Sequence, residues 1–218
     1  MDVIEYGSKT ARAVLLQPVD EHDFASLESE ISAIRKIFPG DFQLTAIRIS
    51  DWNRDLSPWK APAVYGREAF GGRAADTLSE ILRYCADDTR EYYIGGYSLA
   101  GLFALWAACR TALFRGVAAA SPSVWFPGFP DYLKTHEMLS PRVYLSLGDR
   151  EEKTRNPVMA AVGDHIRGVC SLLKARGTDC FLEWNEGNHF RDADLRTAKA
   201  FAWILNSSGQ NATLPRLR

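Results

Sequence analysis

Apolar residues along this chain fall into short runs that are separated by longer stretches with a helical period. Short apolar runs without alternation are typical of strands buried on both faces, as in parallel sheets. Such runs predict strands at residues 13–16, 42–49, 92–94, 117–120, 143–147 and 180–184.

Between these runs, apolar residues recur every three or four positions, which is the period of an amphipathic helix. The clearest stripe consists of Phe24, Leu27, Ile31, Ile34 and Phe38. Asp20 is placed to cap the start of this helix, and Pro39-Gly40 ends it. The same period predicts helices at residues 22–38, 74–85, 99–109, 158–175 and 192–205.

Strands and helices therefore alternate along the chain, which predicts an α/β fold with a mostly parallel central sheet flanked by helices on both faces. We expect a single domain over residues 1–206 and a polar C-terminal tail over residues 207–218. In such sheets ligands bind at the carboxyl ends of the strands, so residues that follow a strand are the candidates for chemistry.

A long irregular stretch, residues 50–72, interrupts this alternation and carries Trp52 and Trp59. Loops of this length inside a domain are usually functional, and tryptophans favour a packed segment over a disordered one. A structural cover over one sheet edge explains the stretch equally well.

Composition excludes several classes of protein. Lys and Arg number 26 against 27 Asp and Glu, a net charge of −1, which argues against a nucleic-acid-binding surface. No apolar run reaches the roughly 18 residues of a membrane span, and the first residues lack the basic and apolar regions of a secretion signal. We expect a cytoplasmic protein with neither nucleic-acid nor membrane partners.

The four cysteines lie outside any C-x-x-C spacing and away from histidines, so we expect reduced core residues and no metal site.

The segment Gly96-Tyr97-Ser98-Leu99-Ala100-Gly101 joins a predicted strand to a predicted helix. A strained turn in this context exposes a serine hydroxyl above the sheet, as in a G-x-S-x-G nucleophile elbow. Residues two positions from the serine must be small, and Gly96 and Ala100 meet that need. Ser98 is therefore the candidate nucleophile, and a glycine-rich turn without catalysis is the alternative.

A serine nucleophile needs a base, and of the four histidines only His189 follows a predicted strand. A third group should orient the imidazole. The turn after residues 143–147 offers Asp149, Glu151 and Glu152, and the residues alone do not choose among them.

The backbone N–H of Leu99, at the helix start, is one expected oxyanion donor. The second normally lies two strands before the elbow, where Val19 or Asp20 can supply it because Pro18 has no N–H. Trp52, Trp125 and Phe126, with Trp59, are candidates to line an apolar substrate pocket.

Four segments of this chain together resemble the esterase D and enterochelin-esterase-like branch of the α/β-hydrolase superfamily. They are residues 96–104, Ser121-Pro122-Ser123-Val124-Trp125, Gly148-Asp149-Arg150-Glu151 and Gly187-Asn188-His189. The resemblance covers about residues 90–205. It implies an α/β-hydrolase fold and a serine carboxylic-ester hydrolase with Ser98 as nucleophile, His189 as base and Glu151 as acid.

Two departures from that family bear on the interpretation. Ala100 stands where the family usually has glycine, and the acid turn carries Asp149 and Glu152 beside Glu151. The chain is also short for this branch, so we expect no large cap domain.

The leading hypothesis is a serine hydrolase that cleaves a small or aryl/acyl ester through an acyl-enzyme, with no cofactor. The alternatives are a non-catalytic ligand- or partner-binding protein of the same fold, an acyltransferase and a serine peptidase. The aromatic loop at residues 52–59 fits an interface between copies of the chain as well as a pocket lip, so homo-oligomerisation stays open.

Overall fold

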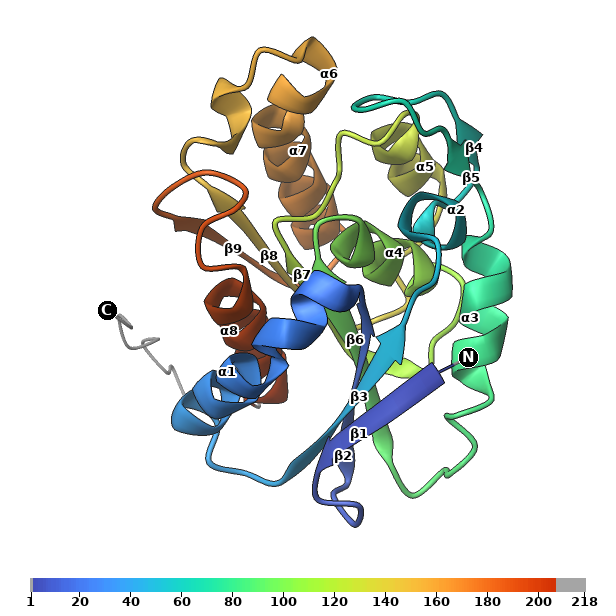
Figure 1. Cartoon of the computed structure of the whole chain (residues 1–218), viewed down its shortest axis with the longest axis vertical. Coiled ribbons are helices and arrows are strands. Elements are labelled where there is room, and N and C mark those ends of the chain that lie inside the picture. The colour runs from blue at the N-terminus through green and yellow to red at the C-terminus, as the bar shows by residue number, and fades with distance from the viewer. Residues whose placement is uncertain (1, 207–218) are drawn as a thin grey trace.

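The computed structural model describes residues 2–206 and places the predicted strands in one seven-stranded sheet (Figure 1). Every neighbouring pair is parallel except β1 with β3, which is antiparallel. This arrangement confirms the predicted α/β fold. In their order across the sheet, the strands are β1 (Asp2–Gly7), β3 (Phe42–Arg48), β2 (Ala13–Val19), β6 (Glu91–Tyr97), β7 (Phe114–Ala120), β8 (Arg142–Gly148) and β9 (Asp179–Asn185).

Helices cover both faces of the sheet. On one face, α1 (Glu21–Ile37) packs against α8 (Ala193–Leu205). The other face carries α3 (Ala74–Leu82), α4 (Leu99–Ala107) and α7 (Val162–Ala175). Alternate residues of a strand face opposite layers, so Leu15 of β2 packs with the first layer while Val14 and Leu16 pack with the second.

Strand β2 is longer than its apolar run and includes Gln17, Pro18 and Val19. Pairing with β3 continues to Val19, whereas pairing with β6 ends at Leu16. Pro18 is tolerated because a residue without an N–H can occupy a strand where one neighbour has already ended. The expected loop after this strand therefore begins only at Asp20.

Several other boundaries differ from the prediction. The sequence pattern missed β1, an edge strand whose burial alternates, and α5 (Phe129–Thr135). Helix α3 ends at Leu82 rather than at residue 85. The helix predicted at residues 158–175 is two helices, α6 (Pro157–Ala160) and α7, because only α7 carries a buried apolar face.

The irregular stretch after β3 contains α2 (Trp52–Leu56) and a two-stranded ribbon of β4 (Lys60–Ala61) and β5 (Phe70–Gly71). The four cysteines are free; Cys170 and Cys180 are buried as expected of core residues, whereas Cys85 and Cys109 are only partly buried. Within residues 2–206, no helix is both long and apolar enough to span a membrane. The expected tail at residues 207–218 lies outside the described residues.

Candidate active site

The loops that follow β6, β8 and β9 lie at one edge of the sheet, since the three strands are parallel members of it (Figure 1). Ser98 follows β6, Glu151 follows β8, and His189 follows β9. The sheet therefore brings together three side chains that are far apart in the sequence.

Ser98 occupies a strained turn between β6 and α4. Its φ of 55° and ψ of −118° are rare for a residue with a side chain and cost about 1–3 kcal/mol. A Cβ on Gly96 would lie only 2.6 Å from the Cβ of Ala100, so position 96 has no room for a side chain. The expected elbow geometry is present, and Ala100 fits because Gly96 leaves it space.

A continuous chain of hydrogen bonds links Ser98, His189 and Glu151. The Ser98 Oγ lies 3.0 Å from His189 Nε2, and His189 Nδ1 lies 2.7 Å from Glu151 Oε2. The His189 side chain is 27% exposed, whereas that of Glu151 is 5% exposed. The imidazole is thus reachable from solvent, and the carboxylate behind it is not.

The three acids of the turn after β8 have different partners. Asp149 accepts the N–H of Gly187 at 2.8 Å, and Glu152 pairs with Arg167 of α7 at 3.2 Å. Of the three, Glu151 is the residue whose carboxylate contacts His189.

Burial raises the pKa of Glu151, but hydrogen bonds and the charge of the neighbouring His189 together outweigh that effect and hold the pKa below its ordinary value. Those bonds come from His189, from the N–H of Gly148 at 2.7 Å and from the hydroxyl of Ser121 at 2.8 Å. A Cβ on Gly148 would lie 3.0 Å from Glu151 Oε1 and 2.4 Å from Gly187 O, so only glycine allows this close approach. The carboxylate is kept ionised beside the imidazole.

The sequence reasoning missed Arg196, which lies directly behind Glu151. Its side chain is 2% exposed, and its Nη1 is 2.9 Å from Glu151 Oε1. Arg196 shares the buried face of α8 with Ala200 and Ile204. A lone arginine among apolar residues four and eight positions on is the signal that could have identified it.

The segment Ser121-Pro122-Ser123 after β7 also contacts the site. The hydroxyl of Ser121, a residue with a φ of 42°, donates to Glu151. Ser123 Oγ lies 3.3 Å from Ser98 Oγ. The N–H of Ser123 donates to Ser98 O at 3.0 Å. This short turn therefore contacts both ends of the hydrogen-bonded chain.

The two expected oxyanion donors lie at the same edge. Leu99 is the first residue of α4, and Val19 is the last residue of β2, which pairs with β6. Asp20 caps α1, and its N–H is 3.4 Å from the carboxylate of Asp23. Val19 and Asp20 both stay predictions for the second donor.

The predicted pocket residues divide into buried and half-buried ones. Phe126 is fully buried and packs against Trp59 and Phe70, so its assignment to an open pocket was wrong. Trp125 is 6% exposed, and its ring meets Tyr65 edge-on at 5.8 Å. Its contribution to a pocket wall is correspondingly small.

Trp52 is half-buried and lines an open hollow with Asn53 and Tyr65. The rings of Tyr65 and Trp125 connect this hollow with the segment that carries Ser123. The assignment of Trp52 as a substrate contact stays a prediction.

Sequence reasoning also missed Phe190, whose side chain is 88% exposed. Its ring stands edge-on to that of His189 with centroids 5.6 Å apart. An exposed aromatic ring beside the imidazole offers an apolar surface at the rim of the site.

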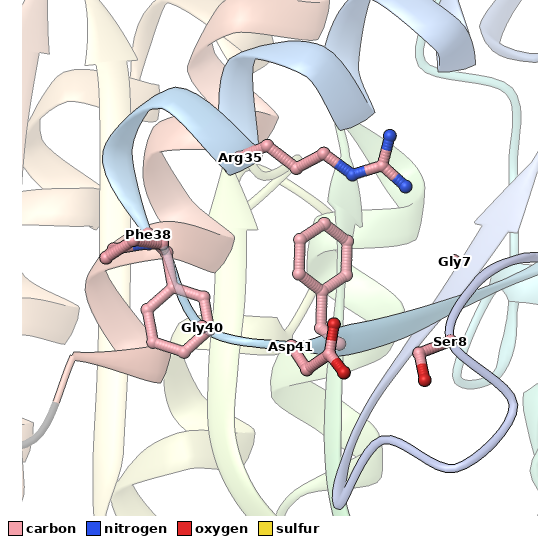
Figure 2. Close-up of a pocket in the computed structure, with 8 residues that line it drawn as sticks. Gly7, Ser8, Arg35, Phe38, Gly40 and Asp41 are labelled. Atoms are coloured by element: carbon pink, nitrogen blue, oxygen red, sulfur yellow. The ribbon is translucent and has the colours of Figure 1, made fainter.

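A second hollow lies at the opposite edge of the sheet (Figure 2). Gly7, Ser8, Arg35 and Asp41 line it, at the end of α1 and the start of β3. It is therefore remote from Ser98.

Several solved structures with similar folds are named as hydrolases or esterases. An IroE-like serine hydrolase from Shewanella oneidensis is 16% identical with a TM-score of 0.73, and the match covers 92% of this chain and 74% of that one. The siderophore hydrolase EstA from Aspergillus nidulans is 21% identical with a TM-score of 0.64, over 91% and 84% of the two chains.

The chain has the α/β-hydrolase fold.

A third α/β-hydrolase neighbour is the fluorophosphonate-binding serine hydrolase FphF from Staphylococcus aureus. It is 11% identical with a TM-score of 0.61, and the match covers 94% of this chain and 98% of that one. Among residues 2–206, no cap domain is evident over the sheet. No protein-family model and no curated protein sequence matches the chain.

Proposed function

We propose that this α/β-hydrolase is a serine carboxylic-ester hydrolase. The observation that carries the proposal is the unbroken hydrogen-bonded chain from Glu151 through His189 to the hydroxyl of Ser98. Nucleophile, base and orienting acid are recognised by such geometry rather than by sequence position.

In the proposed reaction, Ser98 Oγ attacks the ester carbonyl while His189 Nε2 takes its proton. Glu151 accepts a hydrogen bond from the Nδ1–H of His189, which fixes the tautomer in which Nε2 is free to act as base; this proton placement is assigned from the hydrogen bonds. The protonated imidazole then delivers the proton to the departing alcohol. Water hydrolyses the acyl-enzyme by the same steps, which regenerates Ser98.

The negative charge of the tetrahedral intermediate needs donors aimed at its oxygen. We assign the first to the N–H of Leu99, because the N-terminus of α4 also favours negative charge there. The second comes from Val19 or Asp20 at the end of β2.

We propose a small or aryl/acyl ester as substrate. The half-buried Ser98 and the exposed Phe190 favour a substrate held at an open rim. One neighbour of this fold is named as a siderophore hydrolase, which makes siderophore esters the first natural candidates to test.

An open rim also bears on the alternatives. Acyl transfer is favoured when water is excluded from the acyl-enzyme, whereas His189 here is 27% exposed. Hydrolysis is therefore the preferred outcome. A purely ligand-binding role gives no reason for the 3.0 Å contact of Ser98 with His189 at a strained turn.

Labelling with a fluorophosphonate probe, followed by peptide mass spectrometry, tests the proposal. We expect an adduct on Ser98, because the activated hydroxyl attacks phosphorus and the oxyanion donors hold the product. Ser98→Ala should take up no probe and should hydrolyse no activated aryl ester, with a melting temperature close to that of the unsubstituted protein. A folded protein that forms no adduct at neutral pH would favour the ligand-binding alternative.

A further inference from the structure

The buried guanidinium of Arg196 contacts both the proposed acid and the loop that carries the proposed base. Its Nη1 lies 2.9 Å from Glu151 Oε1, on the side of the carboxylate opposite His189. The carboxylate therefore has an imidazole on one oxygen and a guanidinium on the other.

The same guanidinium holds the β9–α8 loop by its backbone. Its Nη2 donates to the carbonyls of Glu186 and Asn188, both at 3.1 Å. Its Nη1 also donates to the hydroxyl of Tyr97 at 3.1 Å, and that hydroxyl in turn donates to His189 O at 2.7 Å. One side chain thus positions the acid and the backbone on both sides of the base.

A buried arginine is expensive, because the guanidinium loses its hydration. Arg196 is 1% exposed, and its Nε is buried without a hydrogen-bond partner. The other buried residues of α8 are apolar except Thr197, so the packing of the helix does not by itself call for a charge there. The position of the charge therefore points to a role beyond packing.

We propose that Arg196 is a positioning residue for the proposed esterase reaction and that it sets the pH range of that reaction. A carboxylate shared with a guanidinium stabilises the imidazolium of His189 less than an unshared carboxylate does. Sharing therefore weakens the attraction between the carboxylate and the imidazolium, so we expect the reaction to reach its full rate at a lower pH. This inference rests on the proposed function.

Four parts of the chain place titratable or charged groups around His189: the end of β6, the turn after β8, helix α8 and the loop that carries His189. Tyr97 ends β6, Asp149, Arg150 and Glu151 follow β8, Arg196 belongs to α8, and Glu186, Arg191 and Asp192 lie on the loop itself. Glu186 and Asp192 pair with Arg191 at the exposed rim. Arg196 is the cation that shares the buried carboxylate of Glu151.

The test is the pH profile of kcat/KM for an activated aryl ester in two variants of Arg196 and one control variant. In Arg196→Gln, the acidic limb should move to higher pH by about one unit, the scale of a nearby charge, and kcat should fall. Arg196→Lys keeps the positive charge but loses the second guanidinium nitrogen, which holds the loop carbonyls. In this variant kcat should fall, while the acidic limb of the pH profile stays near its original position. KM should change little in both.

Arg142→Gln is the matched control. Arg142 is also mostly buried, at 16% exposure, and pairs with Asp179 at 3.0 Å at the start of β8, the end opposite to Glu151. Its loss should lower the melting temperature without moving the acidic limb.

An acidic limb that stays in place in a folded, slower Arg196→Gln variant would show a structural role only and would overturn the proposal. If the glutamine variant does not fold, Arg196→Met supplies a neutral side chain suited to the apolar face. Should the unsubstituted protein neither hydrolyse the ester nor take up the fluorophosphonate probe, the proposed function itself fails. If the unsubstituted protein is active but its pH profile has the same acidic limb as the Arg196 variants, only the proposed role of Arg196 is wrong and the proposed function stands.

Discussion

Glu151 receives more hydrogen bonds than a carboxylate needs merely to hold an imidazole. Its Oε1 accepts from Gly148, Ser121 and Arg196 at 2.7–2.9 Å, while Oε2 faces His189. Each donor stabilises the ionised form, and the pKa of Glu151 stays low despite burial. At the scale of the residue, the site is built to keep one carboxylate charged.

Glu151→Gln should therefore lower kcat by roughly 10⁴, the cost of removing a triad acid's charge while retaining its shape. KM should change little, because the carboxylate lies behind the imidazole. Steady-state kinetics with an activated aryl ester measures both constants.

Glu152→Gln is the neighbouring control, since Glu152 pairs with Arg167 on α7 rather than with His189. It should retain nearly full activity. A greater loss in Glu152→Gln than in Glu151→Gln would show that the acid is assigned to the wrong residue.

The elbow depends on how closely β6 and α4 approach each other. Gly96 and Ala100 face each other across the turn, and a methyl group at position 96 would meet that of Ala100. A closely packed turn of this kind holds Ser98 at its unusual φ.

Gly96→Ala should therefore destabilise the protein by about 1–3 kcal/mol, as overpacking does, and should lower activity. The double variant Gly96→Ala/Ala100→Gly should recover part of both losses, because it moves one methyl group to the other side of the turn. Chemical denaturation and ester hydrolysis measure the two effects. Equal damage in the single and double variants would contradict the steric explanation.

A second element pair, β2 with α1, buries a carboxyl group away from the site. Glu30 is 3% exposed and accepts from Gln17 Nε2 at 3.2 Å, while Oε1 of each residue is buried without a partner. Burial raises the pKa of Glu30 well above its ordinary value. The neutral acid is therefore the form that the fold favours.

This shift has a defined effect on stability. Above the unfolded pKa, the unfolded chain has released a proton that the native state still holds, so the stability contributed by Glu30 falls as pH rises towards the folded pKa. Glu30→Gln removes the titration and keeps a donor beside Gln17. The variant should have a higher melting temperature than the unsubstituted protein at pH 8, and the difference should shrink towards pH 4. A difference that does not vary with pH would contradict a neutral Glu30.

At the scale of the whole molecule, periodicity predicted the six parallel strands of the main sheet because buried parallel strands are continuously apolar, but not the short ribbon of β4 and β5. It missed β1, an edge strand with one face open, and α5, which is only seven residues long. Elements with little buried surface leave a weak pattern in the sequence.

The residues of the candidate site also divide into those that the sequence predicted and those that it did not. Ser98, His189 and Glu151 could be predicted because strand ends, chain order and family resemblance all indicate them. The contacts of Arg196 and Ser123 could not, since they join segments remote in sequence; the sequence marks Arg196 only as a lone arginine on an apolar helix face. Phe126 was assigned to a pocket because aromatic residues near strand ends fit a core and a rim equally well, and only the fold places it in the core.

The two contacts of the hydrogen-bonded chain belong to different parts of the molecule. His189 and Glu151 are held together through Arg196 of α8, whereas Ser98 sits at the start of α4 on the other face of the sheet. Tyr97, the residue before Ser98, joins the two parts, because its hydroxyl donates to His189 O at 2.7 Å. The distance between the Ser98 hydroxyl and the imidazole is therefore set across the sheet, by a helix layer on each face and by the strand between them.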